Sequence, residues 1–379
     1  MAYDKVVDSA SLDSKLTQVA DAIRTKGNTS AGLQFPSGFI SAIQAIQTGT
    51  ELQIIVSVTS GATVTATKGS KVVSGTSVDG TCTLVVPEEG EWTVSATLGG
   101  ETSRSNIVNV TSSYDTTLVF ISPILNDNSW ETIRGISDAG TGENFWSIGD
   151  RKAVTLNGTV GTLTLSNYTT YAFIIGFNHN SSLEGTNRIH FQLAKDALSS
   201  GTDVALCDSG YGNAFMGQFI MNSSESNDGG WESSFMRKYI CGTSMLSYSN
   251  TIIAVIPEAL RTVLKYVTKY TNNTGRLQPG IEAATATTDY FFLLSEYEVF
   301  GTFGASNIGE SKKQAQYLYY SSGNSKVKYN YSATSIAVTW WLRSPVASGS
   351  EQFVAASANG TVASDDARRS FGFAPGFCV

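Results

Sequence analysis

The chain has 379 residues, 41% of them hydrophobic and 11% aromatic, which is enough to build the cores of two or three domains. Only 15% of the residues are charged and the net charge is −7, so the chain lacks the clustered Lys and Arg that nucleic-acid binding requires. No apolar run reaches the ~18–20 residues that span a bilayer, and we therefore expect no membrane insertion.

Residues 1–50 have the apolar spacing of two short helices. The first is predicted from apolar residues that recur at intervals of three or four, namely Leu12, Leu16, Val19, Ala20 and Ile23. Ser11 is its expected N-cap and Gly27 its stop, and a second helix is expected from Pro36 to near Gly49. Two short amphipathic helices cannot hold a core alone. Their apolar faces must therefore pack on copies of themselves, on the next domain or on another protein.

Residues 51–122 change to a period of two, with six or seven short β-branched runs separated by glycine turns. This pattern is typical of an antiparallel β-sandwich, in which Trp92 would point inward. The block resembles the immunoglobulin-like modules that space out surface proteins and phage fibres. It contains no cluster of ligand-binding residue types, so we expect a spacer.

Residues 123–379 mix strands and helices without a regular β-α-β alternation, which predicts an α+β domain. A helix is expected after Asn128 or Ser129 as its cap, with an inward face formed by Trp130, Ile133 and Ile136. Strands are predicted at residues 152–167, 171–180, 188–194 and 289–301, and a pair of helices at residues 233–246 and 257–273.

The cysteines and histidines are too dispersed for a zinc site. The chain has Cys82, Cys207, Cys241 and Cys378, and its histidines are His179 and His190. None of the usual metal-ligand spacings is present, and we predict no cofactor. Four free, buried thiols are expected, with a disulfide between two of the last three cysteines as the alternative. A calcium site in NDNSWE, residues 126–131, is a further alternative to helix capping there.

An enzymatic alternative depends on Glu296 and Glu298, which are two residues apart on a predicted strand. Their carboxylates would share one face about 6–7 Å apart, near the range of an inverting glycosidase pair. The same pattern also fits an ordinary polar strand face, which we favour. Asp365 and Asp366 are adjacent, so in an extended chain they point apart and make a poor acid/base pair.

The last forty residues join two aromatic ends through a stretch without helical or strand period. Trp340, Trp341 and Leu342 lie at one end, and Phe373 and Phe377 at the other. Large side chains of this kind stabilise a fold by roughly 1.5–3 kcal/mol each when buried. We therefore expect a rigid framework that leaves the residues between its two ends on the surface.

Seven phrases in this region resemble an uncharacterised domain family of phages and prophages from Gram-positive gut bacteria. They cover most of residues 123–379 and are NDNSWETIRGISDAGTGENFWSIGD, MRKYICGTSM, VTKYTNNTG, TTDYFFLLSEYEVFG, NSKVKYN, WWLRSP and FGFAPGFCV. The first helices also resemble the start of many structural proteins of those phages. Some members of the family look like the variable proteins of diversity-generating retroelements, a class of which the phage major tropism determinant is the familiar case. The resemblance implies a C-type-lectin-like fold with randomised residues near its C-terminus.

In this chain the corresponding exposed, ligand-binding positions would be Val346, Gly349, Glu351, Gln352, Ala355, Ser357, Thr361, Ser364, Asp365, Asp366, Arg368, Arg369 and Phe371. Glu351 and Gln352 depart from the pattern, because changes at the first two bases of an Asn codon cannot produce them. A fixed ligand-binding tip is therefore the alternative to a diversified one.

The resemblance implies a phage receptor-binding protein of the tail tip or fibre. Its expected partners are a bacterial surface protein or glycan, phage tail or baseplate proteins, and copies of itself in a homotrimer. It would be located on the virion and be extracellular after lysis, since MAYDKVVDSASLDSKL lacks the pattern of a secretory signal. The alternatives are a glycan-cleaving tail enzyme that uses Glu296 and Glu298, and a structural decoration protein.

Overall fold

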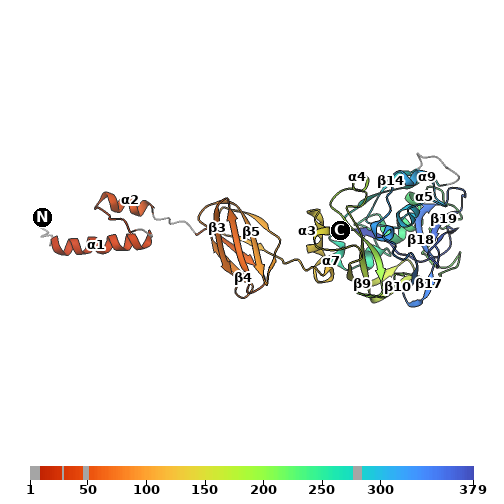
Figure 1. The fold of residues 1–379 in the computed structure, drawn as a ribbon, viewed down its shortest axis with the longest axis horizontal. Helices are drawn as coiled ribbons and strands as arrows, with labels where there is room; N and C mark the ends of the chain where they lie inside the picture. The colour runs from red at the N-terminus through yellow and green to blue at the C-terminus, as the bar shows by residue number, and fades with distance from the viewer. Residues whose placement is uncertain (1–8, 28–29, 46–50, 276–283) are drawn as a thin grey trace. The chain divides into compact units, whose positions relative to one another are not determined.

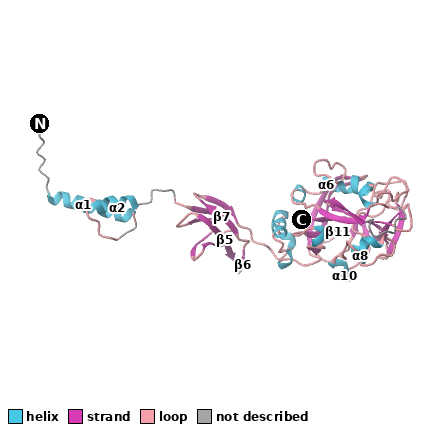
Figure 2. Cartoon of the chain, turned by 90° about the horizontal axis from the view of Figure 1, so that it is seen from above, coloured by secondary structure: helices cyan, strands magenta, loops and turns pink. Residues whose placement is uncertain are grey.

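The computed structural model describes residues 9–27, 30–45, 51–275 and 284–379. Its internal contacts divide the chain into an N-terminal unit, Met1–Phe120, and a C-terminal unit, Ile121–Val379. The fold is α+β as predicted, with more residues in strands than in helices (Figure 2).

The N-terminal unit begins with a helical hairpin of α1 (Ser9–Lys26) and α2 (Ser37–Ala45), whose apolar residues pack on each other (Figure 1). α1 ends where predicted, and the Gly27 N–H donates to a carbonyl one turn earlier at 2.8 Å. Ser11 is not the N-cap, because the helix already includes it. The predicted end of the second helix near Gly49 lies outside the described residues.

Eight strands follow in the N-terminal unit. They are β1 (Gln53–Ser57), β2 (Thr63–Lys68), β3 (Lys71–Thr76), β4 (Thr81–Val85), β5 (Gly90–Leu98), β6 (Glu101–Thr102), β7 (Asn106–Val110) and β8 (Tyr114–Thr117). One sheet has the order β4-β1-β8, in which β1 and β8 run parallel. The other has the order β3-β2-β5-β6, and β7 pairs with β5. The period of two predicted the β structure of this block, but eight strands form where six or seven were expected, and the β1–β8 pair is parallel, not antiparallel.

Both sheets contribute to one hydrophobic core. Ile54 and Val56 from β1 and Val94 from β5 are fully buried, and they alternate with more exposed residues along their strands. Trp92 is also fully buried, which confirms its predicted inward direction, and its indole N–H donates to the Glu88 carbonyl at 3.1 Å. The alternation in the sequence reflects this one buried face per sheet.

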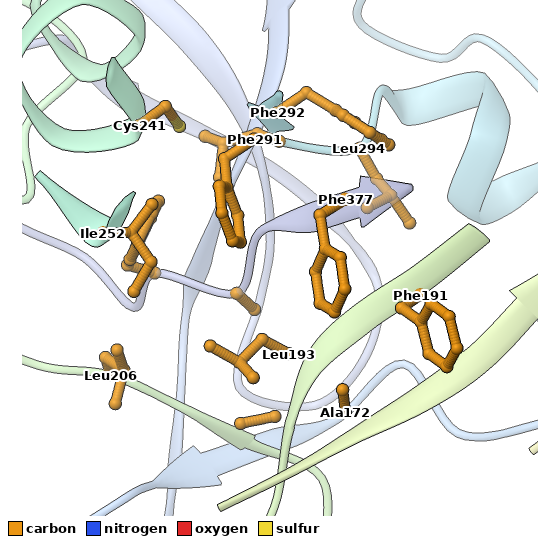
Figure 3. Packing of buried hydrophobic residues seen from close by; sticks show 14 of the residues in the cluster. Ala172, Phe191, Leu193, Leu206, Cys241, Ile252, Phe291, Phe292, Leu294 and Phe377 are labelled. Carbon is orange, nitrogen blue, oxygen red and sulfur yellow. The ribbon is translucent and has the colours of Figure 1, made fainter. Parts of the chain in front are cut away.

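The main sheet of the C-terminal unit has five strands in the order β15-β21-β11-β10-β9. These are β9 (Arg151–Val160), β10 (Leu163–Phe177), β11 (Ile189–Lys195), β15 (Phe291–Phe292) and β21 (Gly376–Cys378). The last residues of the chain thus form an inner strand. Phe377 on β21 stacks on Phe191 of β11 with ring centroids 5.3 Å apart, and Figure 3 shows both rings within the core.

The predicted helix after residue 128 is present as α3 (Trp130–Asp138). Ser129 is its N-cap, because the Ser129 hydroxyl accepts a hydrogen bond from the Thr132 N–H at 3.0 Å. Its inward face of Trp130, Ile133 and Ile136 is buried as predicted. Trp130 packs edge-on against Phe191, which attaches the helix to the main sheet.

Three smaller sheets complete the C-terminal unit. They combine β12 (Val204–Ala205), β16 (Lys328–Asn330) and β17 (Ala333–Val338); β13 (Val267–Asn272) and β14 (Ala284–Asp289); and β18 (Trp340–Pro345), β19 (Gln352–Ala356) and β20 (Val362–Asp366). Five of the thirteen predicted ligand-binding residues lie on strands of the third sheet, and the other eight lie in the segments that join or follow these strands.

Short helical turns connect these sheets. They are η1 (Leu125–Asp127), η2 (Gly142–Asn144), α4 (Ser181–Glu184), α5 (Gly230–Ser233), the π-helix η3 (Met236–Gly242), α6 (Ile252–Val255), α7 (Glu258–Arg261), α8 (Glu296–Phe300), α9 (Ile308–Ser311) and α10 (Leu318–Ser321). The helix predicted at residues 257–273 is wrong beyond α7. Its second half is β13, because Val267 and Thr271 lie among alternating residues that pair with β14.

All four cysteines are buried and free, as predicted. Burial raises the pKa of Cys207 and of Cys378 to about 12, so both thiols stay protonated at neutral pH. Cys378 lies 3.4 Å from Nδ1 of His190 inside the core. These thiols contribute as apolar core residues.

Candidate functional site

The predicted binding stretch is built on the sheet β18-β19-β20. β19 and β20 form an antiparallel hairpin in which Gln352 pairs with Asp366 and Ala356 with Val362. β18 lies on the other side of β19, which is therefore the central strand. The edge strand β20, with Arg368 and Arg369 just after it, is exposed or half-buried.

The aromatic framework that supports this sheet is buried as predicted. Its members are Trp340, Trp341, Leu342, Phe373 and Phe377. The indole N–H of Trp341 lies 3.0 Å from the Phe219 carbonyl and 3.2 Å from the Arg369 carbonyl. Trp341 therefore anchors the backbone of the binding stretch directly to the core.

Three of the thirteen predicted positions are not exposed. Val346, Ala355 and Phe371 are buried, so their prediction as surface contacts is wrong. Ala355 lies on the central strand β19, in which all residues after Gln352 are buried. Phe371 packs on Trp341 with ring centroids 4.8 Å apart and belongs to the framework. A large ring beside the aromatic end of the stretch is better satisfied by the core than by solvent.

The other ten positions are exposed or half-buried, namely Gly349, Glu351, Gln352, Ser357, Thr361, Ser364, Asp365, Asp366, Arg368 and Arg369. The most accessible of them are Glu351, Gln352, Thr361 and Ser364. Asp365 through Arg369 therefore do not pack into the interior, apart from the buried Ala367 between them. The β19–β20 hairpin thus exposes polar side chains at the edge of the sheet, next to a buried apolar core.

The charged residues of this edge form ion pairs with one another. Arg369 Nε donates to Asp365 at 2.8 Å, and Arg368 Nη2 contacts Asp366 at 2.5 Å. Burial alone would raise the pKa of Asp366, but the hydrogen bonds and charge of Arg368 keep it below its ordinary value. Arg368 also lies 2.7 Å from Glu225. The guanidinium groups of Arg368 and Arg369 are thus pre-oriented, which lowers the entropy cost of binding a partner.

Sequence reasoning missed a second segment, residues 208–227, that packs alongside the binding stretch. The carboxylate of Asp208 accepts hydrogen bonds from the Ser370 hydroxyl at 2.8 Å and from the Phe219 N–H at 3.1 Å. The Met221 N–H donates to the Ala367 carbonyl at 2.8 Å. Asp208 therefore ties this loop to Ser370, 162 positions later in the chain.

This loop brings an exposed aromatic residue to the polar edge. Phe215 is 81% exposed, and the guanidinium carbon of Arg368 lies 4.9 Å from the centroid of its ring. Met216 beside it is also exposed. We call the set of Phe215, Met216, Glu225, Gln352, Ser364, Asp365, Asp366, Arg368 and Arg369 the candidate surface. The signal that could have revealed Phe215 is an apolar pair, FM, inside a glycine- and asparagine-rich loop.

The alternative carboxylate pair has a different geometry from the one predicted. Glu296 and Glu298 lie in the first turn of α8, not on a strand, because Ser295 and Glu298 form a capping box. Both side chains are fully buried. Glu296 accepts hydrogen bonds from the N–H groups of Gly304 at 2.8 Å and Ser306 at 2.7 Å. These contacts give the pair a structural role in the core.

Glu298 also belongs to a buried cluster of residue types that bind metals. Ligand atoms of His179, Glu184 and Glu298 lie within 4.8 Å of one another. The ammonium of Lys269 lies 2.6 Å from Glu184 and 3.0 Å from Glu298, and Arg343 pairs with Glu298 as well. Two cations thus balance two carboxylates, so the cluster needs no metal ion to balance its charge.

His179, which belongs to this cluster, and the nearby His190 are uncharged core residues. His179 stacks on Tyr317 with ring centroids 3.8 Å apart, and His190 Nδ1 lies 3.0 Å from the Tyr317 hydroxyl. Burial and the charge of Lys269 lower the pKa of His179 to about 3, and they lower that of His190 as well. Neither histidine is protonated at neutral pH, and neither reaches the candidate surface.

Two amide oxygens of the proposed calcium site accept hydrogen bonds from the backbone. Asn126 Oδ1 accepts from the Ala153 N–H at 2.9 Å, and Asn128 Oδ1 accepts from the Ser122 N–H at 3.0 Å. Both side chains thus hold the start of the C-terminal unit. Asn126 and Asn128 therefore have structural roles in addition to the capping by Ser129.

Comparison with known proteins adds one finding. Residues 212–379 match the model of a domain of unknown function, DUF6273. No curated protein matches the chain. The matched region includes Phe215, the sheet β18-β19-β20 and the whole candidate surface. Among the described residues, no helix is both long and apolar enough to cross a membrane.

Proposed function

We propose that the protein is a phage receptor-binding protein of the tail tip or tail fibre, and that it binds a bacterial surface protein or glycan through the candidate surface. The observation that carries this proposal is a polar edge with an exposed aromatic ring, held on a framework of buried rings. Aromatic residues, Met and Arg are enriched where proteins bind partners. Phe215, Met216 and Arg368 provide this combination.

The separation of surface from core also supports a binding role. A surface that must accept different side chains cannot supply the core, because cores respond to a change of one methylene. In this chain Trp341, Phe373 and Phe377 form the core, while Ser364 and Asp365 lie outside it. Such a surface suits either a fixed ligand or a stretch diversified by a retroelement. A nearby reverse-transcriptase gene with a near-copy of the 3′ end, rich in Asn codons, distinguishes the diversified form.

For the other regions of the chain we infer roles from the family resemblance. The C-terminal unit is then a C-type-lectin-like domain and residues 51–122 an immunoglobulin-like spacer. The N-terminal helices join copies into a homotrimer or attach them to phage tail or baseplate proteins. The site of action is the virion, outside the cell after lysis. Several copies on one particle raise the avidity of a weak single contact.

The test is binding of the fluorescently labelled full chain to a panel of Gram-positive gut bacteria, measured by flow cytometry. The variant carries Phe215→Ala and Arg368→Ala, and the matched control carries Ile107→Ala, which removes an exposed apolar side chain from the N-terminal unit. We expect the double variant to bind at least tenfold more weakly than the control, as for a pair of hot-spot residues. Equal binding by both variants contradicts the proposal. Release of sugar from host glycans by the wild type would favour the enzymatic alternative.

A further inference from the structure

The chain contains the dipeptide Asn-Gly twice, as Asn157-Gly158 and as Asn359-Gly360, and each copy is followed by Thr and Val. Asparagine before glycine is prone to lose its side-chain amide, because glycine has no Cβ to hinder attack by its backbone nitrogen. The residues that follow are the same at both sites. A difference in reactivity between the two sites therefore reports the fold around them.

Asn359 lies at the tip of the β19–β20 hairpin, and its side chain is exposed. Two backbone hydrogen bonds close this turn. The Ser357 N–H donates to the Thr361 carbonyl at 2.8 Å, and the Gly360 N–H donates to the Ser357 carbonyl at 2.9 Å. Only the second of these bonds must open to free the Gly360 nitrogen. Opening a single hydrogen bond in a turn at the surface costs little free energy.

The side-chain amide of Asn359 is surrounded by hydrogen-bond donors. Its Oδ1 accepts from the Thr361 N–H at 3.2 Å and from the Thr361 hydroxyl at 2.7 Å, and the Ser357 hydroxyl is a third donor. Donors in this arrangement draw electrons from Cγ, and they stabilise the negative charge that develops on the oxygen when a nucleophile attacks that carbon. The turn thus brings an electrophilic carbon and activating donors together.

Asn157 has different surroundings, although its local sequence is the same. It lies inside the ten-residue strand β9, which pairs with β10. Its Oδ1 accepts from the Asn167 N–H at 3.3 Å, and the hydroxyl of Thr159 lies 3.1 Å from that of Thr164. Movement of the Gly158 nitrogen toward Asn157 disturbs a paired strand, which costs more free energy than opening a turn.

We propose that Asn359 is a self-modification site, at which the folded chain converts this asparagine to aspartate and isoaspartate. The Gly360 nitrogen loses its proton to a solvent base and attacks Cγ of Asn359. The bond from Cγ to Nδ2 breaks, ammonia leaves, and a succinimide ring forms. Water then opens the ring. Cleavage between Cγ and the Gly360 nitrogen gives aspartate, and cleavage at the main-chain carbonyl gives isoaspartate. One water is consumed and one ammonia released, without oxidation or reduction.

The product changes the tip of the hairpin in charge and in shape. A carboxylate replaces the neutral amide between Ser357 and Thr361, which are both predicted ligand-binding positions. In isoaspartate the main chain also passes through Cγ, so the turn gains one carbon atom. The chemical step does not depend on the proposed function, because the residues of the turn alone carry it out.

The test incubates the full chain at neutral pH and body temperature and follows both Asn-Gly sites by peptide mapping with mass spectrometry. Replacement of NH₂ by OH adds about 1 Da, and chromatography separates the aspartate and isoaspartate peptides. In the folded chain we expect Asn359 to convert at least about tenfold faster than Asn157. In the urea-unfolded chain the two rates should agree within about threefold, because the local sequences match.

The role of the donors is tested with Thr361→Val, which removes the hydroxyl and keeps the N–H and the shape. It should slow the conversion of Asn359 about threefold or more. The matched control is Thr159→Val, the same change after the other Asn-Gly, and it should leave the rate at Asn157 unchanged. Conversion of Asn157 in the folded chain as fast as that of Asn359, or a folded chain in which Asn359 keeps its amide, would overturn the proposal. An unchanged or faster rate in Thr361→Val would overturn the activation by these donors.

Discussion

Arg343 on β18 and Glu298 on α8 form a two-pronged ion pair that is closed to solvent. Nη1 of Arg343 lies 2.5 Å from Oε2 of Glu298, and Nη2 lies 2.9 Å from Oε1. Burial alone would raise the pKa of Glu298, but the charges of Arg343 and Lys269 lower it below its ordinary range. The pair fastens the strand below the candidate surface to the helix that begins at Ser295.

Replacing this arginine should destabilise the C-terminal unit strongly. In Arg343→Met, Glu298 loses its bidentate partner, and the carbonyl of Leu293 and hydroxyl of Thr271 lose donors at 2.8 Å. Breaking a buried pair on one side costs about 3–5 kcal/mol. Urea unfolding monitored by tryptophan fluorescence measures the loss. The matched control is Arg134→Met, which removes a half-exposed pair with Asp138 and a hydrogen bond to the Val263 carbonyl, and it should cost about 1–2 kcal/mol. Equal losses would contradict the structural role of the buried pair.

Among the predicted binding residues, the exposed ones should tolerate substitution and the buried ones should not. Ser364→Ala on the exposed edge of β20 should change the free energy of unfolding by less than about 0.5 kcal/mol. Phe371→Ala removes a ring that packs on Trp341 and should cost about 3–5 kcal/mol. Ala355→Leu overpacks the central strand and should cost about 1–3 kcal/mol.

Thermal and urea unfolding of the three variants check this division. The same curves of the wild type provide the reference for each. A loss for Ser364→Ala as large as that for Phe371→Ala would mean that the polar edge belongs to the core, and the candidate surface would then have no accessible face.

The framework could be predicted from the sequence because large rings gather at both ends of the closing stretch. Trp340, Trp341 and Phe377 have too much apolar surface to be left in water, and their burial follows from composition and position. Asp365 and Arg369 are charged, and charged side chains are rarely buried, so their exposure could be predicted as well. Phe371 was misplaced because it borders both regions, and only the packing on Trp341 assigns it to the core.

The errors in secondary structure occur where two local signals compete. Residues 289–301 begin as a β run, but Ser295 and Glu298 start a helix through reciprocal hydrogen bonds. Residues 257–273 begin as a helix, but Val267 and its neighbours pair with β14. Phe215 was missed for another reason. It reaches the candidate surface through long-range contacts of Asp208, which local patterns do not contain.

Glu310 makes the stability of the C-terminal unit depend on pH. Its carboxylate is fully buried and accepts hydrogen bonds from the Ser344 hydroxyl at 2.5 Å and from the Asn272 N–H at 2.9 Å. Burial raises the pKa of Glu310 from 4.5 to about 7, although these hydrogen bonds act in the opposite direction. Between pH 4.5 and about pH 7, the Glu310 carboxyl group binds more protons in the folded state than in the unfolded state. The contribution of this group to stability is therefore fully present below about pH 4.5 and is lost as pH rises through 7.

Glu310→Gln should remove this pH dependence, because glutamine has no proton to lose. At pH 5 the folded wild type holds a neutral carboxyl group, so the two proteins should differ little apart from local packing. At pH 8 the wild type carries a buried negative charge, and the variant should gain up to about 3 kcal/mol relative to it. Urea unfolding at both pH values measures the gap, and Glu131→Gln at an exposed site of α3 is the matched control. A gap that stays the same at pH 5 and pH 8 would show that Glu310 keeps its charge in the folded protein throughout.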